Sequence, residues 1–128
     1  MDAAAQEIVT LTQRLLDSIA KADWKTYAEL CDASISCFEP EARGHLVEGM
    51  PFHEYYFKLG ADPNPRTTTL AQPHVRLLGA DAAVIAYSRL VQKLDGAGGP
   101  TVAFSQETRV WQKKDGRWKH VHFHRSVE

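Results

Sequence analysis

Apolar side chains follow helical spacing in the first half of the chain and strand spacing in the second half. Ile8, Leu15 and Ile19 recur on one side of a helix, and Asp23 is a suitable N-cap for a second one. From residue 66 onward the pattern is that of β-strands separated by short turns. The pattern predicts helices at residues 5–20, 23–30 and 50–58, and strands at 67–70, 74–78, 83–94, 101–113 and 118–125. Helices followed by an antiparallel meander indicate one α+β domain over residues 1–128, with the helices packed on one face of a curved sheet.

Composition and charge narrow the functional classes. The 128 residues are 44% apolar and 24% charged, as in a soluble globular domain with one core. The net charge is −1 with both signs interspersed, so we expect no nucleic-acid partner, which would need a clustered basic face. No apolar run approaches the ~20 residues of a membrane span, and the acidic N-terminus lacks a signal-peptide core. We therefore expect a cytoplasmic protein that does not bind membranes.

The two cysteines fit that compartment. Cys31 falls on a predicted helix and Cys37 on an extended segment. Their placement on different elements favours two buried thiols over a disulfide framework.

Three arginines lie within apolar, β-prone runs: Arg89, Arg109 and Arg125. A buried guanidinium is costly unless a carboxylate or another hydrogen-bonding group meets it. Period-two alternation puts Arg89 on the same face as Tyr87. The three arginines can therefore line a pocket for an anion, pair with internal carboxylates such as Glu107 and Glu41, or face water. A planar guanidinium suits bidentate binding of a carboxylate, which makes the first alternative the functional hypothesis.

The last hairpin decides whether these arginines meet. With a two-residue turn at Asp115-Gly116, Lys114 pairs with Arg117, and Arg109 and Arg125 point to opposite faces. With a three-residue loop Lys114–Gly116 that ends in a glycine bulge, Lys113 pairs with Arg117 instead. Glu107, Arg109, Trp111, Val121, Phe123 and Arg125 then share one face, and His120, His122 and His124 share the other. The residues alone allow both registers.

The histidines are candidate metal ligands or bases. His120, His122 and His124 alternate along one strand, so they suit either a metal with a further ligand or a subunit contact. His53, on the aromatic helix, can act as a base or an anion-binding donor, or be a hydrogen-bonded core residue. We assign no metal ligands, no cofactor and no catalytic residues.

Together these segments resemble the association (hub) domain of calcium/calmodulin-dependent protein kinase type II. The resemblance covers nearly the whole chain and rests on FEPEA at 38–42, LVEGM at 46–50, FH at 52–53, YF at 56–57, PHV at 73–75, IAYSR at 85–89, ETRVW at 107–111, DGRW at 115–118 and VHFHRS at 121–126. It implies the cone-shaped fold of nuclear transport factor 2 and the SnoaL-like cyclases, with a strongly curved antiparallel sheet around a long N-terminal helix.

The resemblance also implies an assembly and a site. Members of this family build two stacked rings of about six or seven subunits each, so a homo-oligomer is expected. It places Arg89, Arg109 and Arg125 in a pocket that accepts a small carboxylate, with His53 near its mouth. This placement favours the three-residue bulged loop, with Gly116 at positive φ. Glu41, Tyr87 and Glu107 are possible partners within that pocket.

Kinase activity and direct calmodulin binding are not expected of this chain. It lacks the kinase glycine-rich loop, strand lysine and catalytic-loop aspartate, and its first helix is too acidic for a calmodulin target. The alternative to a binding hub is an enzyme of the SnoaL or ketosteroid isomerase type acting on a small carboxylated or keto substrate. We favour binding, because three cations would keep a nearby carboxylate ionised and make it a poor base.

Overall fold

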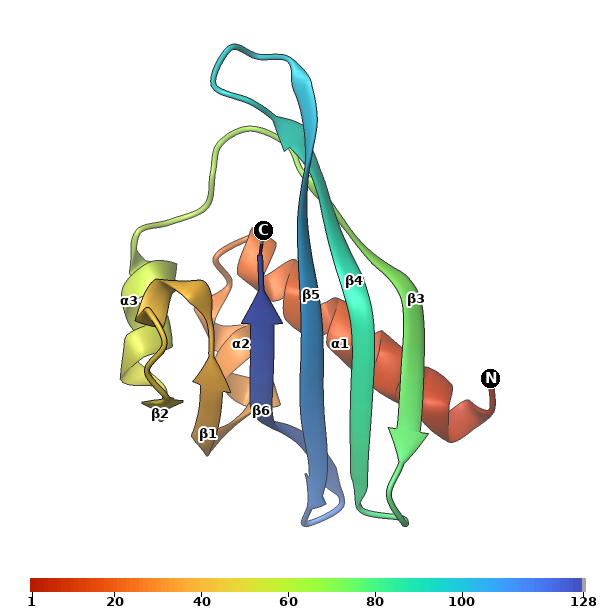
Figure 1. Ribbon diagram of the computed structural model, residues 1–128. Coiled ribbons are helices and arrows are strands. Elements are labelled where there is room, and N and C mark those ends of the chain that lie inside the picture. The colour runs from red at the N-terminus through yellow and green to blue at the C-terminus, as the bar shows by residue number, and fades with distance from the viewer. Residues whose placement is uncertain (128) are drawn as a thin grey trace.

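A curved sheet with helices on one face forms the domain (Figure 1). The computed structural model describes residues 1–127. Its elements, in chain order, are α1 (Ala3–Ala20), α2 (Trp24–Leu30), β1 (Cys31–Phe38), a short 3-10 turn η1 (Pro40–Ala42), β2 (Val47–Glu48), α3 (Pro51–Lys58), β3 (Thr67–Leu77), β4 (Ala82–Leu94), β5 (Pro100–Lys114) and β6 (Arg117–Ser126). The predicted α+β class is confirmed.

The six strands lie in the order β2-β1-β6-β5-β4-β3. β3 to β6 form the expected antiparallel meander, while β1 runs parallel to β6. The sheet is therefore mixed rather than wholly antiparallel. In Figure 1, α1 crosses behind the sheet, and α3 lies beside β1 and β2 at one end of it.

Local chemistry explains the helices. Asp2 accepts a hydrogen bond from the Ala5 amide at the start of α1, and Asp23 does the same for Thr26 at α2, which confirms Asp23 as an N-cap. Ile8, Leu15 and Leu16 of α1 are fully buried against the sheet. None of the helices within residues 1–127 is long and apolar enough to cross a membrane.

Two predictions of element boundaries are wrong. Cys31 is the first residue of β1, not part of a helix, so both cysteines lie on one strand. The two predicted strands at 67–70 and 74–78 form one strand, β3. An irregularity between Ala71 and His74 interrupts its pairing, where Gln72 has a positive φ of 52°. Gln72 and Pro73 therefore lie at an irregularity within one strand, and they do not divide it into two strands.

The register of the β5–β6 hairpin combines parts of both alternatives. Lys114 pairs with Arg117, and Asp115 and Gly116 have positive φ values of 53° and 76°, as in a type I′ two-residue turn. The predicted three-residue bulged loop is therefore wrong, although positive φ at Gly116 is confirmed. A bulge does occur further along β6, where the register shifts between the Val110 and Trp111 pairs.

That bulge decides which side chains share a face. Trp111 pairs with His120 and Val110 with His122, so Val121 is the extra residue of β6. Beyond it, Arg109 pairs with Phe123 and Glu107 with Arg125. Arg109 and Arg125 thus share the helix-covered face, as the bulged register required.

Candidate functional site

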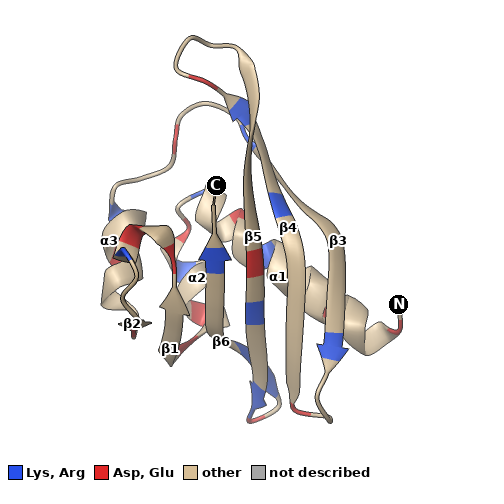
Figure 2. Ribbon diagram, viewed as in Figure 1, with Lys and Arg blue, Asp and Glu red and all other residues tan. Residues whose placement is uncertain are grey.

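A cavity of about 220 Å³ lies between the helices and the concave face of the sheet. All four residues predicted for the anion pocket line it: His53, Arg89, Arg109 and Arg125. Glu41, one of the predicted partners, lines the cavity as well, and so does Glu39. Figure 2 shows the basic and acidic segments close together on β4, β5 and β6. The sequence therefore predicted which arginines converge.

A buried ion network centred on Glu107 holds Arg89 and Arg109, two of the arginines that line this cavity. The Glu107 carboxylate accepts hydrogen bonds from Arg109 at 2.8 Å, Arg89 at 3.1 Å, Tyr87 at 2.6 Å and Ser105 at 3.0 Å. These residues meet because Tyr87 pairs with Glu107 and Arg89 with Ser105 across adjacent strands. Glu107 and Tyr87 therefore contact the arginines, although neither is among the residues that line the cavity.

Charge pairing overcomes the cost of burying Glu107. Burial alone would raise the pKa of Glu107, but the guanidinium groups of Arg109 and Arg89 and the Tyr87 hydrogen bond hold that pKa well below its ordinary value. Glu107 is therefore an anion at neutral pH and a poor proton acceptor.

Arg109 has all its polar atoms engaged. Its side chain is 1% exposed, its Nε donates to the Tyr87 hydroxyl at 2.8 Å, and its NH1 lies 3.4 Å from His120 Nε2. The guanidinium carbon also sits 4.4 Å from the centre of the Phe123 ring. Arg109 contributes positive charge to the cavity from a fixed position.

Arg89 and Arg125 are less completely satisfied. Only NH1 of Arg89 meets Glu107, and within residues 1–127 its buried Nε has no hydrogen-bond partner. Arg125 forms an ion pair with Glu41, in which both side chains are partly exposed. The internal salt bridges expected as an alternative are therefore present, and they leave donor capacity at Arg89 and an exchangeable pair at Arg125.

His53 is buried on α3 beside two groups that sequence reasoning did not assign to the site. Its Nε2 lies 3.8 Å from Cys37 Sγ, and its Nδ1 lies 3.5 Å from the Tyr27 hydroxyl. Burial, with a smaller contribution from Arg109, lowers the pKa of His53 to about 4, so the imidazole is neutral at pH 7. Burial rather than the positive charge of the arginines is the main cause of this lowered pKa.

Glu39 also escaped the sequence analysis. Burial, reinforced by the Glu41 carboxylate, raises the pKa of Glu39 to about 7 despite the nearby Arg125 and Arg109. The arginines therefore keep the Glu107 carboxylate ionised, whereas they do not offset the effect of burial on Glu39. Period-two spacing from the buried Ile35 and Cys37 was the available signal that Glu39 faces inward.

The three histidines of β6 do not share one face, contrary to the prediction. The bulge at Val121 turns His120 into the core, where it is fully buried and stacks on Phe123 with ring centres 5.5 Å apart. His122 lies on the other face and contacts Ser36 Oγ at 2.7 Å. His122 and His124 still share that face, but within residues 1–127 no further ligand forms a group of three with them.

Comparisons with known proteins agree with this architecture. The family model described as the calcium/calmodulin dependent protein kinase II association domain matches residues 4–128. The chain is 49% identical over 126 residues to the delta subunit of calcium/calmodulin-dependent protein kinase type II from Oryctolagus cuniculus, covering 97% of this chain and 24% of that protein. It thus spans about a quarter of the length of this curated relative.

Solved structures extend the match to three dimensions. The association domain of the Caenorhabditis elegans kinase is 51% identical with a TM-score of 0.93, covering 98% of this chain and 96% of that one. A hub homology domain from Chlamydomonas reinhardtii is 49% identical with a TM-score of 0.92, covering 98% and 99% of the two chains. Proteins of the nuclear transport factor 2-like superfamily share the fold.

Sequence and fold both agree with these relatives over almost the whole chain. The protein belongs to the calcium/calmodulin-dependent protein kinase II association-domain family.

Proposed function

We propose that this chain is an oligomerisation hub that assembles with copies of itself into a closed, two-ring particle and binds a small carboxylate in its cavity. The observation that carries the hub assignment is the association-domain match over residues 4–128. The similarity to a structure described as a hub homology domain supports it. As a non-catalytic domain, it would act by bringing copies of itself, and whatever is joined to them, together.

Exposed apolar side chains support self-assembly. On α3, Tyr55 is 61% exposed and Leu59 69% exposed, and on β5, Val102 is 54% exposed. Phe104 and Leu46 are exposed as well. Large apolar side chains gathered on a small domain mark surfaces that a partner covers, and a second copy of the chain is the partner that the family assignment favours.

The native mass tests the hub directly. We expect light scattering coupled to size exclusion to give a particle of about twelve to fourteen copies of the 14.3 kDa chain at micromolar concentration. Serial dilution should leave this mass unchanged over a broad range, because a closed ring has no free ends. A monodisperse monomer would refute the hub.

The cavity supports the carboxylate proposal through the unused donors at its wall. Its volume of about 220 Å³ equals that of roughly seven water molecules in the liquid, which is enough for a short hydroxy- or keto-acid. Arg89 bonds Glu107 through NH1 and its side chain is 13% exposed, and within residues 1–127 the ion pair of Arg125 is with the partly exposed Glu41. An incoming carboxylate can take the place of Glu41 on Arg125, while Arg109 and His53 border it.

Replacing Arg125 tests this site without disturbing the buried network. A charge-assisted hydrogen bond is worth ~1.5–3 kcal/mol, so we expect Arg125→Gln to weaken binding of a short hydroxy-acid by roughly 10- to 100-fold. Isothermal titration calorimetry measures the change. Arg117→Gln is the matched control, because Arg117 lies on the same strand and is exposed at the turn. Equal binding by both variants would place the ligand elsewhere.

The enzymatic alternative can be tested at the same cavity. Acid–base chemistry needs a group that titrates near working pH, and Glu39 is the cavity carboxylate with such a pKa, about 7. Because within residues 1–127 the hydrogen-bond partners of His53 are the Tyr27 hydroxyl and the Cys37 thiol, with no carboxylate to stabilise an imidazolium, we expect no exchange of keto-acid α-protons above the buffer rate in deuterated water. NMR measures this exchange. Exchange that disappears in Glu39→Gln or His53→Ala would favour the enzyme.

A further inference from the structure

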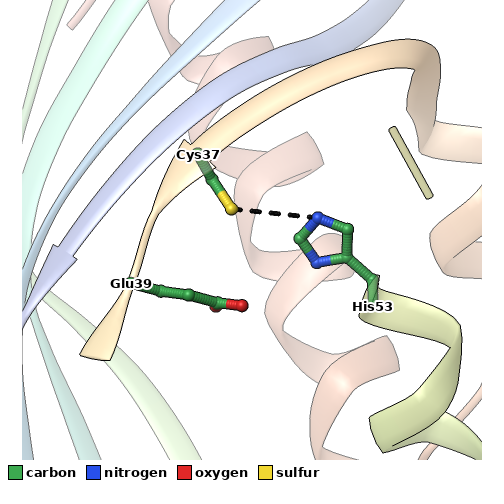
Figure 3. A group of neighbouring side chains, drawn as sticks. All are labelled: Cys37, Glu39 and His53. Atoms are coloured by element: carbon green, nitrogen blue, oxygen red, sulfur yellow. Dashed lines mark hydrogen bonds between the residues drawn. The ribbon is translucent and has the colours of Figure 1, made fainter. Parts of the chain in front are cut away.

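Three side chains of different chemistry meet at the edge of the cavity. Cys37, Glu39 and His53 each bring one donor atom into a group whose members all lie within 4.8 Å of one another. Figure 3 shows the thiol and the carboxylate pointing from one strand end toward the imidazole on α3. Cys37 is fully buried and His53 is 5% exposed, while Glu39 is partly buried. The group is separate from the Glu107 network.

The backbone fixes these donors. Cys37 pairs with Val47 of β2 and with Phe123 of β6, so its position is held from both sides. Glu39 follows two residues later and points to the same side. The Gly49 amide donates to the Ile35 carbonyl at 2.7 Å, which ties the segment entering α3 to β1 and sets His53 opposite Cys37. A site on fixed elements needs little reorganisation to bind.

We propose that Cys37, Glu39 and His53 form a binding site for a thiophilic divalent cation, best matched by Zn²⁺, with a fourth coordination position open to the cavity. One sulfur, one nitrogen and one oxygen ligand are a donor set that zinc accepts, and three protein ligands leave a position for water or an anion. Thiolate disfavours Mg²⁺ and Ca²⁺, which prefer oxygen ligands.

The distances suit tetrahedral coordination. Zn–S and Zn–N bonds of ~2.3 and ~2.05 Å at a tetrahedral angle put sulfur and nitrogen ~3.6 Å apart. Cys37 Sγ and His53 Nε2 are 3.8 Å apart, so this pair needs almost no movement. The Glu39 carboxylate oxygen lies within 4.8 Å of the other two donor atoms, so it has to move by about 1.5 Å at most to complete the site.

The surroundings also suit a cation. A thiolate and a carboxylate neutralise the two charges of Zn²⁺, so the filled site places no net charge beside Arg109 and Arg125. The Tyr27 hydroxyl, 3.5 Å from His53 Nδ1, can accept that N–H and keep Nε2 free for the metal. A Cys–His nucleophile would use the same two atoms, but burial raises the pKa of Cys37 to about 12, which disfavours an activated thiolate in the absence of metal.

Cobalt titration tests the site. Metal-free, untagged protein is titrated with Co²⁺, and we expect one ion per chain, a sulfur-to-cobalt charge-transfer band and the intense visible bands of tetrahedral cobalt. Zn²⁺ should displace the cobalt and abolish these bands. Cys37→Ser should lose the charge-transfer band, and Glu39→Gln and His53→Gln should weaken binding at least tenfold.

Cys31→Ser is the matched control. Cys31 is the other buried cysteine, and its Sγ lies 3.5 Å from His120 Nδ1, so it offers the same pair of donors without a carboxylate in the group. The control should titrate like the wild type. Bands that persist in Cys37→Ser and vanish in Cys31→Ser would overturn the assignment. So would the absence of a charge-transfer band in the folded wild type, a result that does not depend on any variant folding.

Discussion

Replacing Glu107 by glutamine is expected to lower the free energy of unfolding by ~3–5 kcal/mol, the usual effect of breaking a buried ion pair. Glu107 is 3% exposed and is the only carboxylate that Arg109 contacts within residues 1–127. In the variant, Arg109 remains buried with its charge uncompensated. The amide nitrogen also cannot accept, so the two residues that donate to one of the present oxygens lose their acceptor: Tyr87 and Arg109 at Oε1, or Arg89 and Ser105 at Oε2.

Urea denaturation at pH 7 measures this loss, with the protein concentration held constant because assembly stabilises the folded chain. Glu54→Gln is the matched control. Glu54 faces Lys58 at 3.6 Å on the exposed side of α3, and such surface pairs contribute only ~0–1 kcal/mol. Equal effects of the two substitutions would show that the Glu107 network does not stabilise the fold.

The pH dependence gives an independent check. Because the folded-state pKa of Glu107 lies below its ordinary value, its contribution is fully present above the unfolded pKa of ~4.3 and is lost as pH falls through the lowered folded value. The difference between wild type and Glu107→Gln should therefore stay constant from pH 8 to about 5 and shrink in more acid solution. A difference that grows on acidification would contradict the assignment.

The arginine cluster could be predicted because strand periodicity is simple. Alternation placed Arg89 on the face of Tyr87 and Arg109 on the face of Glu107. Whether Arg125 shares that face depended on the register of the β5–β6 hairpin. A bulge at Val121, rather than one at the turn, brings Arg125 to that face. A turn leaves a signal in its own residues, Asp115-Gly116, whereas the bulge lies inside β6 with no glycine to mark it.

The bulge also explains the misplaced histidine. Regular alternation from His122 would turn His120 outward, but the extra residue reverses the parity and buries it against Trp111 and Phe123. The neighbouring β1–β6 ladder is irregular over the same stretch, between the pairs formed by Cys31 and Ser36. Packing of one strand on another is a tertiary effect, and neither strand encodes it alone.

Cys37 and Glu39 were missed for a related reason. Their inward direction follows from β1, but their proximity to His53 depends on how α3 docks against that strand. The docking is set by the β1–β2 pairing and by the Gly49 amide, both of which join segments separated along the chain. Sequence spacing indicates a face, and only the fold shows which faces meet.

The remaining question about the ion network is whether it serves stability or recognition, and Arg109→Met addresses it. Alone, this change leaves Glu107 in the core with only Arg89 as a cationic partner, so we expect a loss of ~3–5 kcal/mol. Combined with Glu107→Gln, it removes the charges of both Glu107 and Arg109, while the glutamine oxygen can still accept from Tyr87 if it takes the place of Oε1, or from Arg89 and Ser105 if it takes the place of Oε2. The double variant should therefore be more stable than either single variant.

The double-mutant cycle in urea gives the coupling between the two residues, which we expect to exceed the larger single loss of ~3–5 kcal/mol and so to lie above the ~0.5–3 kcal/mol usual for side chains in contact. Additive losses would mean that Glu107 and Arg109 act independently. A buried ion pair that apolar and neutral groups can replace at little cost is weak evidence for a stabilising role. If the double variant folds and assembles but no longer binds the carboxylate, then the charges of Glu107 and Arg109 serve ligand binding rather than the stability of the fold.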